Sequence, residues 1–154
     1  MFKVSEKKSV PDYEFATVGM LREQLVGSLI CVAHNLIFES SPFSAGYFEF
    51  QDEGIWTSSE DHFLADMVFA RFNVRVVEGE TYAMTYDNSE SQFVRSAFEI
   101  CLFFAWRTLL LSADERLAVT IDHDGEITIC GNTKQQVDKL ATSLQSHLSR
   151  EFEI

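Results

Sequence analysis

The stretch LAVTIDHDGEITICGNTKQQVDKLATSLQSHL, residues 117–148, sets the fold class of this chain. Its first half has apolar residues at every second position on both sides of a polar turn, which is the pattern of a β-hairpin. Its second half has apolar residues three or four apart, which is the pattern of an amphipathic helix. The stretch therefore predicts two antiparallel strands followed by a helix that packs on them.

The register of this hairpin follows from its apolar residues. A three-residue loop at residues 123–125 sets Ile121 opposite Ile127 and Val119 opposite Ile129. A two-residue loop would instead pair each isoleucine with a threonine. Because a slip of one residue turns a whole strand to the wrong face, we predict the three-residue loop.

Helix start signals precede both long apolar segments of the second half of the chain. Thr133-x-x-Gln136 and Ser89-x-x-Gln92 each have the form of a capping box. After Thr133 the apolar positions form one helical stripe: Val137, Leu140, Ala141, Leu144 and Leu148. From Phe93 to Leu111 the chain is apolar almost all round, which predicts a long helix that is central to the core or that covers both a sheet and a partner.

Two further hairpins are expected upstream. Residues 47–50 and 55–57 flank a polar turn and predict the first. Residues 72–76 and 81–86 alternate and predict the second, with a three-residue loop at 77–79. That loop would set Val74 opposite Tyr82 and Phe72 opposite Met84.

The remaining segments complete the expected architecture. Residues 1–12 read as a loose polar leader and residues 13–154 as a single domain, with a helix over about 18–38 in which part could be a strand. We predict an α+β fold with an antiparallel sheet of about five to six strands and three helices on one side of it. The expected order is helix, three or four strands, helix, two strands, helix.

The charge of the chain limits its partners. It has 24 Asp and Glu against 12 Lys and Arg, a formal charge of −12. Such a body repels the phosphate backbone, so nucleic-acid binding is disfavoured, whereas a basic protein would be attracted. The simpler interpretation, that the acids only keep the protein soluble, remains open.

The sequence also indicates a cytoplasmic protein. Its three cysteines include no C-x-x-C pair, and Met1–Lys8 contains no apolar run typical of a secretory signal. The most apolar stretch, residues 100–111, is too short to span a bilayer. We therefore expect a reducing compartment and no membrane partner.

No motif for catalysis or ligand binding is present. The chain has no glycine-rich phosphate loop and no H-x-x-x-H spacing. The segment 122–126, aligned as a calcium loop, would put Thr120 and Gly131 at the first and twelfth ligand positions, where acids are needed. We expect no catalytic, cofactor or metal site, although paired carboxylates leave an enzyme with an unrecognised site as an alternative.

These observations favour a non-enzymatic binding protein that recognises a basic protein surface through acids and aromatic rings. Its most concrete form is a bacterial immunity protein that neutralises a toxin, for which a nuclease is a good candidate. The predicted contact residues cluster around the first hairpin: Asp52, Glu53, Trp56, Glu60 and Asp61.

The order of elements, the length and the low pI also resemble those of class I type III secretion chaperones. The resemblance covers the chain from about residue 18 and rests on no specific motif. It implies a homodimeric adaptor that binds an effector, with the apolar helix Phe98–Leu111 in the dimer interface. Gel filtration separates the two hypotheses, because a strict monomer would remove the adaptor and leave the inhibitor.

Overall fold

The computed structural model of the chain describes residues 14–20, 34–37, 41–51, 75–78, 81–104 and 106–150. Two helices are defined there, α3 (Ser91–Phe103) and α4 (Lys134–Arg150). The strands are β1 (Glu14–Met20), β2 (Gly46–Gln51), β3 (Arg75–Glu78), β4 (Thr81–Tyr86), β5 (Arg107–Ser112), β6 (Leu117–Ile121) and β7 (Glu126–Gly131).

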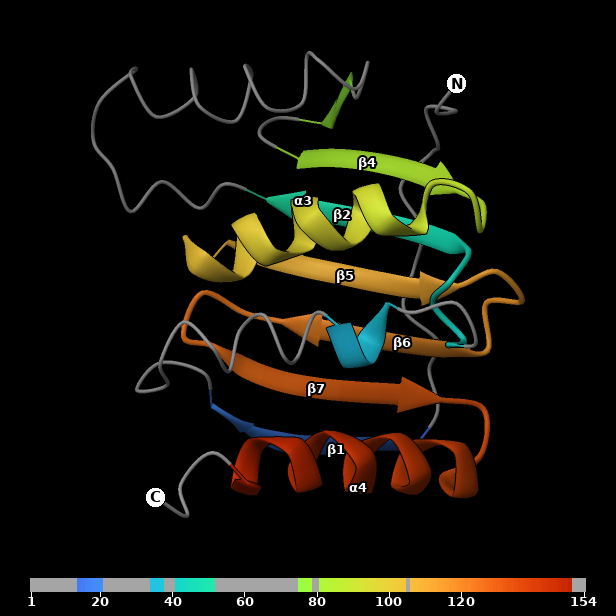
Figure 1. Cartoon of the computed structure of the whole chain (residues 1–154), viewed down its shortest axis with the longest axis vertical. Coiled ribbons are helices and arrows are strands. Elements are labelled where there is room, and N and C mark those ends of the chain that lie inside the picture. The colour runs from blue at the N-terminus through green and yellow to red at the C-terminus, as the bar shows by residue number, and fades with distance from the viewer. Residues whose placement is uncertain are drawn as a thin grey trace.

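All seven strands belong to one antiparallel sheet with the order β1-β7-β6-β5-β2-β4-β3. Both helices lie over the same face of it, as Figure 1 shows. The predicted α+β class with helices on one side is therefore confirmed. The sheet is larger than the five to six strands expected.

The register of the β6–β7 hairpin is the predicted one. Ile121 lies opposite Ile127 and Val119 lies opposite Ile129. Gly125 has a φ of 81°, the left-handed conformation that a three-residue loop requires. The pairing of apolar residues thus determines the loop length.

The start of α4 is also the predicted one. The amide of Gln136 donates to Oγ1 of Thr133 at 3.4 Å, so the threonine caps the helix. The stripe that follows is buried at Val137, Ala141 and Leu144, and α4 packs on β1 and β7.

The predicted helix from Phe93 to Leu111 is wrong in its second half. The helix ends at Phe103, and residues 107–112 form β5. This strand lies between β2 and β6 and is buried on both faces, with Leu110 in one apolar cluster and Leu111 in the other. A strand covered on both faces is apolar all round, and this pattern is also typical of a core helix. The segment Phe98–Leu111, which was expected at a dimer interface, is therefore the end of α3 followed by most of a central strand.

The segment 18–38 begins as a strand, which is the alternative left open for part of the predicted helix. Residues 18–20 belong to β1, whose backbone pairs with β7, and residues 34–36 are helical. The amides and carbonyls along the outer edge of β7 need partners, and pairing with β1 supplies them, which outweighs the helical spacing of the apolar residues. The rest of this prediction, the leader 1–12 and the strand 55–57 lie outside the described residues.

The β3–β4 pair forms as predicted, but in a different register. Val76, not Val74, lies opposite Tyr82, and a bulge follows before Glu78. The shift is two residues, so it preserves the alternation on which the prediction relied. The apolar pattern alone does not distinguish registers that differ by two.

The capping box predicted at Ser89 does not form. The first residue of α3 is Ser91, and no side chain caps the helix at Glu90. Instead the Asp87 carboxylate accepts bonds from the amide and the hydroxyl of Ser89, at 2.8 and 2.6 Å. The carboxylate of Glu90 in turn accepts a bond from the Asp87 amide at 3.1 Å. The reciprocal pair is thus Asp87 and Glu90, two residues upstream of the predicted one.

The β5–β6 and β6–β7 turns allow a matched stability test, because both use a left-handed residue. The amide of Glu115 donates to the Ser112 carbonyl at 2.9 Å, and that of Gly125 donates to the Asp122 carbonyl at 3.0 Å. Glu115 has a φ of 58°, which is unfavourable for a residue with a Cβ.

We expect Glu115→Gly to raise the free energy of unfolding by about 1 kcal/mol and Gly125→Ala to lower it by about the same amount. Urea denaturation measures both. Changes of the same sign in the two variants would contradict this account of the turns.

Candidate protein-binding surface

The five predicted contact residues, Asp52, Glu53, Trp56, Glu60 and Asp61, all lie outside the described residues. The chain passes out of the described part at Gln51, the last residue of β2. Gln51 is paired with Arg107 at the start of β5, and the next strand over ends at Ile121, just before the β6–β7 turn. The end of β2, the start of β5 and the end of β6 thus lie at one end of the sheet. We call it, together with Phe103, the Phe103 end.

A column of stacked aromatic rings leads to this end. Phe50 stacks on Tyr82 with ring centroids 4.8 Å apart and on Trp106 at 5.6 Å. Trp106 stacks on Phe104 at 5.5 Å, and Phe104 meets Phe103 edge to face at 5.3 Å. The inner rings are buried, with 1% exposure for Phe50 and 5% for Trp106. The column therefore connects the core to the surface through a series of ring contacts.

Phe103 is the outer ring of the column and is 59% exposed. It is the last residue of α3, and the last turn of this helix carries no basic residue. The chain then turns back at once, since the amide of Trp106 donates to the Cys101 carbonyl at 2.9 Å. Among the described side chains, Phe103 is the one large apolar residue that is mainly exposed.

The β6–β7 turn brings three carboxylates to the same end. Asp122 holds the turn together, because its Oδ1 accepts bonds from the amides of Asp124 and Glu126, both at 2.9 Å. Asp124 lies 3.5 Å from Nε2 of His123, and Glu126 is exposed. Asp122 thus has a structural role, while Glu126 faces solvent.

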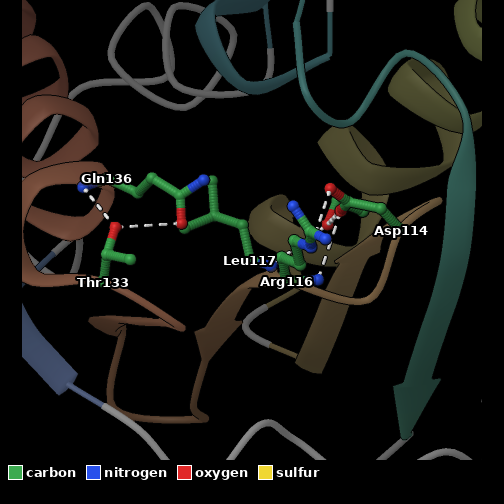
Figure 2. Close-up of polar contacts among 6 residues, drawn as sticks. Asp114, Arg116, Leu117, Thr133 and Gln136 are labelled. Atoms are coloured by element: carbon green, nitrogen blue, oxygen red, sulfur yellow. Dashed lines mark hydrogen bonds and ion pairs between the residues drawn. The ribbon is translucent and has the colours of Figure 1, made fainter.

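At the opposite end of the strands, which we call the Arg116 end, carboxylates stabilise the turns. Oδ1 of Asp114 accepts bonds from the Ser112 hydroxyl at 2.7 Å and from the Arg116 amide at 3.2 Å. Figure 2 shows Asp114 and Arg116 pointing toward each other beside the start of α4. The Ser112 hydroxyl also accepts a bond from the Leu117 amide at 3.1 Å. The bond from the Ser112 hydroxyl and, to a smaller extent, that from the Arg116 amide hold the pKa of the Asp114 carboxyl below its usual value.

Asp87, at the same end, is held in a similar way. The bonds from the Ser89 hydroxyl and amide lower the pKa of its carboxyl. Lowered pKa values of this origin mark carboxylates that stabilise loops, which is a different role from contact with a partner.

The described charges are strongly unbalanced. Ten Asp and Glu side chains and five Lys and Arg side chains are described, and none of them is buried. Glu49, on the face away from the helices, is half-buried and accepts a bond from the Tyr47 hydroxyl. The acids lie at both ends of the sheet, so charge alone does not single out one of them. The exposed aromatic ring distinguishes the Phe103 end.

The same residues show no arrangement typical of a metal site or of a reactive thiol. No group of three or more His, Cys, Asp or Glu in the described ranges is placed to hold a metal ion. Cys101 is buried, and partial burial raises the pKa of the Cys130 thiol, which makes it a weaker nucleophile. No helix in the described parts has the length and apolar character needed to cross a membrane.

Comparison with known proteins gave no relative. No protein-family model, no curated protein and no solved structure matches the chain.

Phe103 is absent from the predicted contact residues, because the pattern predicts that it lies inside a long core helix. A signal was nevertheless present in the pair Phe103 and Phe104. Neighbouring residues of a helix point about 100° apart, so two adjacent large rings at a helix end differ in how far they face the core. Phe104 takes the inner position and Phe103 the outer one.

Proposed function

We propose that this chain is a non-enzymatic acidic binding protein that recognises a basic protein partner. Its most concrete form is an immunity protein that neutralises a basic toxin, such as a nuclease. The proposal rests on one observation: described carboxylates outnumber described Lys and Arg by ten to five, and all of them are on the surface. The formal charge of −12 for the whole chain agrees with it.

The physical reason is electrostatic steering. Complementary charge raises association rates well above those of neutral pairs, and salt weakens this effect. An inhibitor must reach its toxin before damage occurs, so a fast encounter is an advantage. The exposed aromatic ring at the Phe103 end supplies the apolar contact that a specific interface needs.

The first test is capture of the partner from the source cell. We expect immobilised protein to retain a partner with a pI above about 9 at low salt and to release it as salt is raised. The association rate of the purified partner should fall at least about ten-fold between roughly 50 and 500 mM NaCl. A partner of low pI, or a rate insensitive to salt, would contradict the proposal.

The second test asks which acids take part. We expect the double variant Asp52→Asn and Glu53→Gln to weaken binding of the captured partner at least about ten-fold. The matched control is Glu115→Gln with Asp138→Asn, which removes the same charge from exposed positions elsewhere. Equal effects of the two pairs would mean that only total charge matters, and the predicted contact residues would then be wrong.

A further inference from the structure

The sheet face away from the helices carries a buried apolar row. Strand pairing aligns Tyr47 with Leu111, Leu111 with Ala118 and Ala118 with Cys130, from β2 through β5 and β6 to β7. Tyr47 and Leu111 are each 1% exposed and Ala118 is 0% exposed. We call these four residues the far-face row. A sheet face in contact with water leaves its side chains partly exposed, so this row is covered.

The described elements do not supply the cover. Both helices lie over the opposite face (Figure 1). The loop before β2 also leads to that side, since its Phe43 belongs to the helix-side cluster. The turn at residues 113–116 is exposed throughout. The cover therefore comes from the chain outside the described ranges.

We propose that residues 1–13, which include the predicted leader, lie across the far-face row and cover it. This segment joins the sheet at Glu14, the first residue of β1. Glu14 lies opposite Gly131, and the next residue, Phe15, lies opposite Cys130 of the row. Residues 1–13 thus enter the sheet at the level of the row.

Burial along the strands agrees with a cover at this end only. On β5, Leu111 is 1% exposed, Leu109 is 8% exposed and Arg107 is exposed. The next residues of the same face on β6 and β7, Thr120 and Thr128, are half-buried. A single chain segment that crosses beside the start of β1 produces this gradient, whereas a layer of helices would cover the whole face.

The length of the segment is sufficient. From β1 to β2 the row crosses β7, β6 and β5, a distance of about 19 Å at the usual strand spacing. Thirteen extended residues span about 43 Å. The segment can therefore rise above the sheet and still reach Tyr47.

The other long segments outside the described ranges meet the sheet elsewhere. Residues 21–33 follow Met20, which lies opposite Glu126, and residues 52–74 follow Gln51, which lies opposite Arg107. Glu126 and Arg107 are exposed, so the far face is open where those segments leave the sheet.

The composition of residues 1–13 suits this position. Three lysines stand against two acids there, in a chain with a formal charge of −12, and Glu49 lies half-buried beside Tyr47 of the row. Opposite charge therefore favours contact with the body of the protein. The segment also supplies apolar side chains for the row: Phe2, Val4 and Val10.

Photo-crosslinking of the full chain tests the proposal. The residue p-benzoylphenylalanine is placed at Val4 or at Val10, and crosslinked peptides are identified by mass spectrometry. We expect crosslinks within one molecule to peptides that contain the far-face row. The same residue at Gln92, exposed on α3, is the control and should give none. Crosslinks from either position to α3 or α4, crosslinks only between two molecules, or no crosslink would each overturn the proposal.

A second measurement is the alkylation rate of Cys130, the half-buried member of the row, followed site by site with iodoacetamide. Val10→Asp puts a charge against the apolar row and loosens the cover, so we expect the rate to rise about three-fold or more. Ser9→Asp adds the same charge at a position that faces the other way in an extended segment, and it should change the rate less than about 1.5-fold. An unchanged rate in Val10→Asp, or equal rates in the two variants, would contradict the cover.

Discussion

Replacing Gly46 with alanine is expected to lower the free energy of unfolding by about 3 kcal/mol or more. A Cβ at this position would lie 2.1 Å from the backbone oxygen of Leu111. The two residues belong to β2 and β5, which pair directly, so neither backbone can retreat without breaking the sheet. The φ of 156° adds strain for any residue other than glycine.

Gly131→Ala is the matched control for this variant. Its Cβ would meet side-chain atoms of Leu117 and Val137, at 2.9 and 3.0 Å, and flexible side chains move more easily than backbone. We expect a loss of about 1 kcal/mol there. Urea denaturation followed by circular dichroism measures both. Equal losses at the two glycines would contradict the backbone clash.

Truncation of Phe50 is expected to have an effect of similar size. Phe50→Ala should lower the free energy of unfolding by about 3–5 kcal/mol, because it removes a fully buried ring and leaves a cavity. Phe50 is also the ring that joins Tyr82 to Trp106, so its loss separates the inner end of the aromatic column from the rest.

Phe103→Ala is the natural control, since it removes the same side chain from the exposed end of the same column. We expect a change within about 0.5 kcal/mol. A loss at Phe103 comparable to that at Phe50 would mean that the outer ring stabilises the fold, and a role in binding would lose its support.

Local patterns were sufficient where the interacting residues are close in sequence. The register of β6 and β7 followed from four apolar residues around one turn, and the Thr133 cap followed from a four-residue motif. At the hairpin, the alternative register would place apolar side chains in water. At the helix start, loss of the cap would leave a backbone amide unbonded. The α+β class followed from the same patterns.

The elements that the sequence did not predict correctly depend on contacts between segments far apart in the chain. The apolar run after Phe98 fits a core helix and a central strand equally well, and only the pairing of β5 with β2 and β6 distinguishes them. Similarly, residues 18–20 became a strand because β7 offered an edge, and β3 took a register two residues from the predicted one.

The acidic character of this protein and its class of fold were therefore properties of the sequence by itself. The position of the exposed Phe103 ring, the choice between helix and strand after it, and the carboxylates that hold turns came from tertiary structure alone. The physical reason is that a periodic pattern states how many faces of a segment are apolar. It does not state which distant segment covers each face, and that choice determines what remains on the surface.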